Sequence, residues 1–212
     1  MAYTLLLAVV SVALAVIPAL LLALMRLSKV KPVKWLSGAY IAVFRSTPML
    51  VQLSIIYFGL FHYITLPRTL LFGFIAVNRF IPGVVALALN SSAYVAEIFR
   101  AGILAVDKGQ TEAARSLGLS SWQSMRLVVL PQAIKNVLPA LANEVVTMVK
   151  ESSICSMLGM AEIMYTAQTV SGNSYITLAP YVFAAIIYFC INYPASKAIE
   201  AIERRMRRGD KQ

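Results

Sequence analysis

The feature that most limits how this chain can fold is a series of long apolar runs. The first, from Ala2 to Met25, contains no charged residue. Such runs exceed the ~18 apolar residues that identify a membrane-spanning helix. Across the 212 residues, 59% are hydrophobic and only 13% are charged, which leaves no room for an attached soluble enzyme. We therefore predict a single all-α membrane domain with five transmembrane helices, at about 2–25, 48–66, 81–106, 133–158 and 177–195.

The basic residues predict how these helices are oriented. Of the nineteen Lys and Arg residues, thirteen fall in three clusters: Arg26–Lys34, Lys108–Arg126 and Lys197–Lys211. Basic loops face the cytoplasm in multispanning proteins, so we expect the N-terminus outside and the loop 107–131 and the C-terminus inside. The formal charge of +10 then reflects membrane orientation and a basic tail on anionic lipid, and we expect no nucleic-acid partner.

The loop 107–131 contains a polar segment, Gln110–Pro131, between two apolar spans. Glu112 and the following alanines favour a helix with an acid in its first turn. Gly118 stands where a left-handed residue would end that helix, with Leu119 able to pack back on it. Ser120 precedes Gln123 by three residues, which is the spacing of a capping box and predicts a second helix running into Pro131.

This segment resembles the EAA loop of bacterial ABC importer permeases: Glu-Ala-Ala, three residues, Gly, nine residues, an aliphatic residue, one residue and Leu-Pro. Val128 stands where isoleucine is usual. The resemblance implies that the first helix docks into a cleft on a separate ATPase subunit. The residues that it assigns to this coupling are Glu112, Ala113, Ala114, Gly118 and Leu119. The alternative is a cytosolic helical hairpin without a partner.

Two other segments are similar to permeases for polar amino acids, of the histidine, glutamine, glutamate, arginine or opine type. FRSTPMLVQL, from Phe44 to Leu53, resembles the family's FRGTPLLVQL, with Ser46 in place of glycine. VKESSICSML, from Val149 to Leu158, resembles its K-D/E-S/T-S-L pattern, with Glu151 at the acidic position.

The second span is expected to begin at Pro48. Thr47 and Pro48 have the pattern of a helix start, a hydroxyl cap followed by proline at the first helical position. The short apolar stretch before them, Trp35–Phe44, is expected to lie at the inner membrane interface.

Polar residues within the third and fourth spans suggest a substrate site. Asn90, Tyr94 and Glu97 share one face of the third span, and Ala140, Glu144, Thr147 and Glu151 form a stripe on the fourth. Polar groups inside a membrane are costly and by default face a bundle interior or a water-filled path. At 1.5 Å per residue, Asn90 and Glu151 lie about 13 and 10 Å from the outer ends of their spans, at a common level.

We expect Asn90 and Glu151 to contact an amino acid, with Tyr94, Ser91 and Thr147 as neighbours. An ammonium group stripped of water needs a carboxylate, which Glu151 supplies. The structural alternative is that Asn90 and the serines only join helices, and that Glu151 pairs with Lys150 or another helix. Glu97 and Arg100, three residues apart, are expected to form an ion pair.

Nothing in the sequence indicates catalysis. There is no G-x-x-x-x-G-K-S/T phosphate-binding loop and no Ser-His-Asp, Cys-His or metal-ligand grouping. The lone His62 and the widely separated Cys155 and Cys190 are interpreted as packing residues. We expect no enzyme activity and no cofactor in this chain; ATP and Mg²⁺ would be bound by a partner ATPase.

As the resemblance implies, the chain is a permease subunit of a type I importer in the bacterial plasma (inner) membrane. Its partners would be ABC ATPases, a second identical or homologous permease, an extracytoplasmic solute-binding protein and a polar amino acid as substrate. The alternative is a stand-alone secondary transporter or channel, which would leave the EAA loop unexplained and shows no internal repeat here.

Overall fold

The computed structural model describes residues 1–208, so the end of the expected basic tail, 209–211, lies outside the described residues. The long helices are α1 (Ala2–Leu27), α2 (Lys31–Ser46), α4 (Val77–Leu104), α7 (Leu130–Glu151) and α9 (Ala179–Arg208). The shorter ones are α3 (Met49–Ser54), α5 (Lys108–Ser116), α6 (Ser121–Ser124), α8 (Ile163–Ser174), the π-helices η1 (Ile55–Leu60) and η2 (Met125–Val129), and the 3₁₀-helix η3 (Ser152–Leu158). Strands β1 (Leu70–Leu71) and β2 (Ile75–Ala76) form a minimal antiparallel hairpin. Apart from this hairpin the expected all-α class is confirmed.

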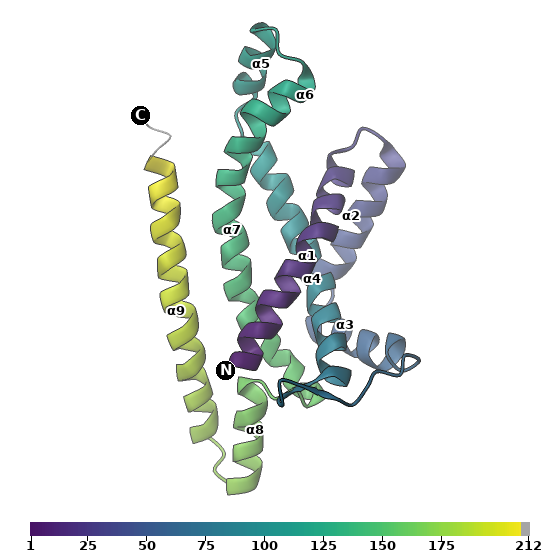
Figure 1. Cartoon of the computed structure of the whole chain (residues 1–212), viewed down its shortest axis with the longest axis vertical. Coiled ribbons are helices and arrows are strands. Elements are labelled where there is room, and N and C mark those ends of the chain that lie inside the picture. The colour runs from purple at the N-terminus through teal and green to yellow at the C-terminus, as the bar shows by residue number, and fades with distance from the viewer. Residues whose placement is uncertain (209–212) are drawn as a thin grey trace.

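Three helices within residues 1–208 are long and apolar enough to cross a membrane alone: α1, α4 and residues 179–206 of α9. A fourth crossing results if α2 and the helical stretch Met49–Leu60 count as one bent span. α7 is less apolar because it carries Lys135, Glu144, Lys150 and Glu151. It nevertheless packs against both α4 and α9, and in Figure 1 it runs along the bundle beside α9.

The helix expected over 48–66 begins at Met49, directly after Pro48, but ends at Leu60, so it is shorter than predicted. α2 ends at Ser46, α3 begins at Met49, and the two parts meet at an angle of 106°. Pro48 has no N–H to continue the ladder, and the residue before a proline avoids helical backbone angles. Thr47 is accordingly extended and does not cap α3 as predicted, because its hydroxyl donates back to the carbonyl of Val43 at 2.8 Å.

The stretch 35–44, expected at the membrane interface, belongs to α2, and one face of it packs against the bundle. Ser37 is fully buried and donates to the carbonyl of Leu22 on α1 at 2.7 Å. The Tyr40 hydroxyl donates to the carbonyl of Leu89 on α4 at 3.0 Å. These hydrogen bonds draw α2 against α1 and α4, which an apolar count along the sequence does not reveal.

The centre of the bundle is the packing of α1 against α4. Ala19 and Ala23 of α1 and Ala93 and Ala96 of α4 are fully buried in one cluster. Small side chains let helix backbones approach closely, which favours helix association where lipid provides no hydrophobic driving force. Gly102 of α4 serves α7 in the same way, since a Cβ at this position would lie 2.4 Å from a methyl group of Val137.

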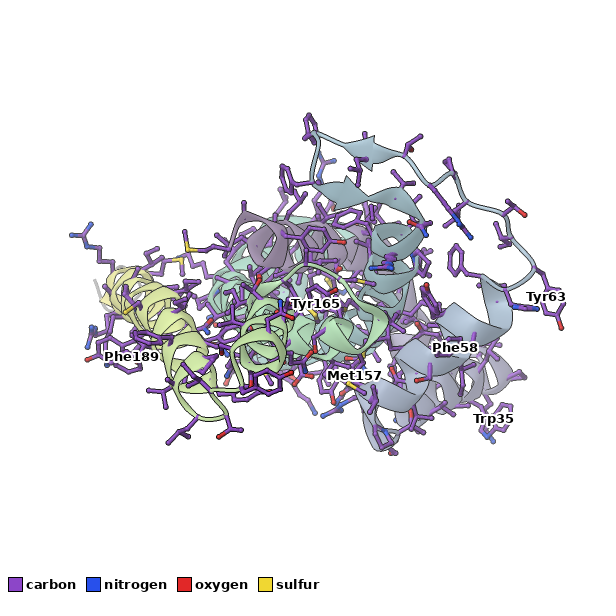
Figure 2. The ribbon with its side chains drawn as sticks, turned by 90° about the horizontal axis from the view of Figure 1, so that it is seen from below. Trp35, Phe58, Tyr63, Met157, Tyr165 and Phe189 are labelled. Atoms are coloured by element: carbon purple, nitrogen blue, oxygen red, sulfur yellow. The ribbon has the colours of Figure 1, made fainter. Side chains whose placement is uncertain are left out.

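The two ends of the bundle differ in the elements that they present. Figure 1 shows α5, α6, the α1–α2 connection and the C-terminal end of α9 at one end, and the N-terminus, α8 and the β hairpin at the other. The described residues of the three basic clusters therefore lie toward the same end. Between the ends, large apolar side chains point outward: Phe58 and Trp35 on one flank and Phe189 on the other (Figure 2). Such a surface suits contact with lipid.

Candidate functional site

The first candidate site is the corner formed by α5 and α6. α5 begins at Lys108, and the side chain of Asp107 caps it by accepting a hydrogen bond from the N–H of Gly109 at 2.6 Å. Glu112 consequently lies in the second turn, so its predicted place in the first turn is wrong. The helix starts earlier than expected because Asp107 supplies the oxygen that the first orphan N–H groups require.

The turn after α5 has the predicted geometry. Gly118 adopts a φ of +86°. Its N–H donates to the carbonyl of Arg115 at 3.0 Å, and the N–H of Leu119 donates to the carbonyl of Ala114 at 3.2 Å. This pair of bonds is a Schellman motif, which requires a left-handed residue. The predicted capping box is also present: the N–H of Gln123 bonds to Ser120 Oγ at 3.2 Å, and Gln123 Oε1 accepts from the Ser120 N–H at 2.8 Å.

Two large apolar residues project from this corner and were not singled out from the sequence. Leu117 is 85% exposed and Trp122 is 70% exposed. The corner lies at the end of the molecule, beyond the long bundle helices (Figure 1). Ala113 and Glu112 are exposed beside them, while Ala114 is buried. Two sequence features could have predicted these exposed residues. Leu117 directly precedes the predicted helix-ending glycine, and Trp122 is a tryptophan in a short polar helix.

The helix after the corner does not stop at Pro131 as predicted. Ser124, Met125, Val129 and Leu130 all keep right-handed helical angles, so the backbone passes from α6 through η2 into α7. The wide π turn of η2 ends immediately before Pro131. A local widening of this kind accommodates a proline that cannot donate its own backbone hydrogen bond.

The second candidate site is a cavity of about 320 Å³ beside the α2–α3 break. Four of the five residues predicted to contact substrate line it: Asn90, Tyr94, Thr147 and Glu151. Glu144 also lines it, together with Thr47, Pro48 and Met49 from the break. The cavity thus has two carboxylates in its wall and no Lys, Arg or His among these lining residues.

The fifth predicted residue, Ser91, is not among the lining residues. It is fully buried between α4 and α7, where its hydroxyl donates to Glu144 Oε1 at 2.8 Å. Ser91 therefore orients the carboxylate of Glu144, which does line the cavity. Ser91 follows Asn90 directly in the chain, so it is turned by about 100° on the helix and cannot share the same face.

Asn90 has a structural role at this cavity. Its amide nitrogen donates to Gln52 Oε1 at 2.9 Å and to the carbonyl of Phe44 at 3.4 Å. Gln52 in turn donates to the carbonyls of Phe44 and Thr47, at 2.8 and 3.0 Å, and to the Thr47 hydroxyl at 2.8 Å. Breaking a helix inside a membrane leaves carbonyl groups without partners, at a cost of several kcal/mol each. Gln52 and Asn90 supply those partners.

The acidic and basic neighbours of the cavity pair as follows. Arg100 binds Glu97 through Nε and Nη2, at 2.9 and 2.6 Å, so the predicted ion pair is present. Among the described residues Glu151 forms no ion pair with Lys150, whose side chain is exposed and outside the cavity. Glu144 and Glu151 instead both line the cavity.

Another buried carboxylate, besides Glu144, lies near the opposite end of the molecule, outside the predicted spans. Glu162 is fully buried and caps α8, accepting from the N–H of Met164 at 2.8 Å and from the N–H of Tyr165. The hydroxyl of Tyr188 on α9 also donates to it, at 2.8 Å. Burial raises the pKa of Glu162, although these hydrogen bonds partly oppose the rise.

An apolar helical bundle with a charged central cavity and an exposed helical corner at one end is the architecture of a transport subunit. The sequence matches the family described as the inner membrane component of binding-protein-dependent transport systems, over residues 11–208. The chain belongs to this family, as the resemblance of its EAA loop predicted.

Individual relatives agree with the family. The chain is 40% identical over 210 residues to the arginine transport system permease protein ArtQ of Bacillus subtilis, covering 99% of this chain and 92% of the relative. It is 41% identical over 198 residues to a putative glutamine transport system permease protein of Rickettsia prowazekii, covering 93% and 87%. The predicted resemblance to permeases for polar amino acids is thereby confirmed.

Solved structures show the same fold. A crystal structure of an amino acid ABC transporter with histidines contains a chain that is 46% identical, with a TM-score of 0.86 and coverage of 97% of this chain and 91% of that one. The inward-facing MetNI methionine ABC transporter gives a TM-score of 0.74 at 19% identity, which supports the type I importer fold alone.

Proposed function

We propose that this chain is the membrane-spanning subunit of an ATP-driven importer, and that it carries an amino acid with a cationic side chain. The observation that supports this most is the cavity lined by Asn90, Tyr94, Thr147, Glu144 and Glu151. Two carboxylates, one for an ammonium group and one for a cationic side chain, suit a substrate such as L-arginine. The Thr147 hydroxyl offers a neutral donor for the substrate's carboxylate, and Asn90, whose amide nitrogen already donates to Gln52 and Phe44, keeps its Oδ1 as an acceptor for an N–H group of the substrate.

Two cations of the third and fourth predicted spans, Arg100 and Lys150, would suit an anionic substrate if they lined the cavity, but neither does. Arg100 is already bound to Glu97, and Lys150 is exposed. An acidic amino acid entering the cavity would meet two like charges without a neighbouring cation in the wall. A binding site that discriminates by charge uses this repulsion as well as attraction.

A comparison of L-arginine with L-citrulline tests the substrate class. Citrulline has nearly the same shape but a neutral end, so the pair isolates the charge. We expect labelled L-arginine to bind the purified permease–ATPase complex at least tenfold more tightly than L-citrulline, and L-glutamate to show no competition. Equal affinity for arginine and citrulline would contradict a cationic substrate; tighter binding of glutamate would reverse the assignment.

Coupling to ATP hydrolysis is proposed to run through the α5–α6 corner. Exposed Leu117 and Trp122 supply apolar anchors, and the small Ala113 beside them allows close approach to a partner. Two such permeases, identical or homologous, would each rest on an ATPase that binds ATP and Mg²⁺, and a solute-binding protein would deliver substrate from outside. ATP binding favours the state in which the two ATPases are closed, so its differential affinity drives alternating access.

The proposed orientation puts the corner and the C-terminus in the cytoplasm and the N-terminus outside, in a bacterial inner membrane. Single cysteines test it: Ser121→Cys on α6 and Gly172→Cys on α8, each in a Cys190→Ser background because Cys190 is exposed whereas Cys155 is buried. We expect an impermeant maleimide to label Gly172→Cys in intact cells and Ser121→Cys only after the membrane is opened. The reverse pattern would invert the topology.

The alternative function, a stand-alone secondary transporter or channel, is not favoured. Membership of the family and the exposed corner both point to a separate energy-supplying subunit. Uptake by the permease alone in proteoliposomes, without an ATPase, would be the result in favour of the alternative.

A further inference from the structure

A second cavity, of about 460 Å³, adjoins the first and is lined by side chains of opposite character. Its charged lining residues are Arg26 from the end of α1, Arg45 from α2 and Glu97 from α4. Tyr94 lines both cavities, so its ring forms the boundary between them. Glu97 follows Tyr94 by one helical turn toward the end of α4 that leads into the α5–α6 corner. The second cavity therefore lies on the side of the first that faces the coupling end.

Arg45 is placed at the boundary between the cavities. Its guanidinium carbon lies 5.3 Å from the centroid of the Tyr94 ring. A guanidinium held by a ring face keeps its N–H groups free at the edge, where they suit a planar carboxylate. Arg45 is exposed to the cavity rather than packed into the bundle.

Arg26 and Glu97 complete the charge arrangement. The guanidinium of Arg26 lies over Gly38, where an added Cβ would be 3.0 Å from Nη1, so the glycine makes room for it. Both nitrogens of Arg100 that bind Glu97 contact Oε2, which leaves Oε1 outside that ion pair. Arg26 and Arg45 line the same cavity as the Glu97 carboxylate. Two guanidinium groups and one carboxylate oxygen thus surround one space.

This set complements the part that all α-amino acids share, a carboxylate beside an ammonium group. The first cavity, with two carboxylates and no lining cation, complements positive charge instead. In the first cavity a cationic amino acid would find two carboxylates for its positive groups. In the second it would find two arginines for its carboxylate. Tyr94, which lines both cavities, marks the change.

We propose that the cavity of Arg26, Arg45, Tyr94 and Glu97 is a second amino-acid site on the cytosolic side of the first, which holds the carboxylate through the two arginines and the ammonium through Glu97. This inference rests on the proposed function, because it takes the same substrate. It adds a site that recognises the backbone groups of the amino acid, whatever its side chain.

The test is the stoichiometry of labelled L-arginine on the purified permease–ATPase complex in phosphatidylcholine nanodiscs. We expect two arginines per permease in the wild type and one in Arg45→Gln, with Arg45→Lys restoring at least part of the second. Agmatine, which is arginine without its carboxylate, should bind once per permease and be unaffected by Arg45→Gln. Gly38→Ala, which displaces the Arg26 guanidinium, should weaken the second site at least fivefold. Lys34→Gln, an exposed cation on the same helix, is the matched control and should leave two sites.

The outcomes separate this inference from the proposed function. One arginine per permease, lost in Glu151→Gln and unchanged in Arg45→Gln, would overturn the second site and leave the proposed function standing. No arginine at all would overturn both. If the cavity serves an anionic lipid headgroup, phosphatidylglycerol will be retained by the wild type and not by Arg45→Gln, with no Arg45-dependent arginine binding, and this too overturns the proposal. Melting temperatures of all variants exclude unfolding as the cause.

Discussion

The α5–α6 corner and the cavity at the α2–α3 break are both interruptions of helices, but they are held in different ways. The corner is closed by hydrogen bonds between residues at most five apart, such as Leu119 to Ala114 and Gln123 to Ser120. The cavity at the break also depends on side chains distant in sequence: Asn90 donates to Gln52 and Ser91 donates to Glu144, across 38 and 53 residues. The corner is therefore a local structure that carries exposed anchors, whereas the cavity depends on the packing of the whole bundle.

This contrast predicts different responses to substitution. At the corner, changes in backbone geometry should matter more than the loss of any one exposed polar side chain. At the cavity, single side chains should matter most, because each is a partner for a buried group. Three experiments test this difference, and a fourth gives a reference away from both regions; they follow in order of decreasing expected effect.

The largest effect is expected for Glu151→Gln at the cavity. The substitution keeps the volume and removes a charge, and a hydrogen bond to a charged group contributes about 1.5–3 kcal/mol, which is roughly a 10- to 150-fold loss of L-arginine affinity. We expect binding, measured by equilibrium dialysis, to fall by that factor while the melting temperature stays nearly unchanged. Lys150→Met is the control. If Lys150→Met restores what Glu151→Gln loses, the two residues form a structural pair and the binding role is wrong.

Gly118→Val tests the corner. A β-branched residue at φ of +86° is strained by roughly 1–2 kcal/mol or more, and no neighbouring atom lies within 4 Å of the added Cβ, so strain alone is probed. ATP-driven uptake should fall about tenfold while arginine binding to the permease persists. Gly118→Asn is the matched variant, because asparagine tolerates left-handed angles, and it should retain most uptake. Normal uptake in Gly118→Val would remove the docking assignment.

The hydrogen bonds that Gln52 and Asn90 make at the α2–α3 break are expected to contribute to the stability of the fold. Gln52→Leu leaves the carbonyls of Phe44 and Thr47 without this donor, at a cost of about 1–3 kcal/mol. Asn90→Leu should cost a similar amount, and the double variant less than the sum, since Asn90 donates to Gln52. Thermal unfolding in detergent measures all three. Additive losses would show that the two residues act separately on the break.

The smallest effect concerns pH and Glu162, away from both interruptions. Because burial raises the pKa of Glu162 above its ordinary value of 4.5, the folded protein binds this proton more readily than the unfolded chain. Stability from this group is therefore greatest below 4.5 and falls as the pH rises toward the raised pKa. We expect a melting temperature about 2–4 °C higher at pH 5 than at pH 8, and a smaller difference in Glu162→Gln. An unchanged difference in the variant would assign the pH dependence to other groups.

Residues close in sequence explain what could be predicted. The left-handed Gly118, the Ser120–Gln123 capping box and the Glu97–Arg100 pair each follow from spacings of a few residues. The face shared by Asn90 and Tyr94, and that shared by Thr147 and Glu151, followed from helical periodicity, and the structure brings these four residues to one cavity.

The errors arose where distant contacts decide. Nothing near Ser91 in the chain indicates that it faces Glu144, and nothing near Gln52 indicates that it bonds across a broken helix. The sequence around Thr47 and Pro48 indicates a helix start, and the structure has a helix start and a sharp bend there. The local sequence does not reveal the partners on α1 and α4 that bind Ser37 and Tyr40 and hold one face of α2 against the bundle. The cap of α5 is a different case, because Asp107 directly precedes the helix. The sequence alone could therefore have predicted that α5 begins at Lys108.

The uninterrupted helical path from the corner into α7 has a mechanical consequence. α7 has 22 residues and ends at Glu151, so it reaches from the corner to the cavity, roughly 33 Å at 1.5 Å per residue. A rod of this length that tilts by about 5° moves its far end by about 3 Å, which is the length of one hydrogen bond. A small push on Trp122 would thus be enough to separate Glu151 from a bound ammonium group, with no rearrangement inside the helix itself.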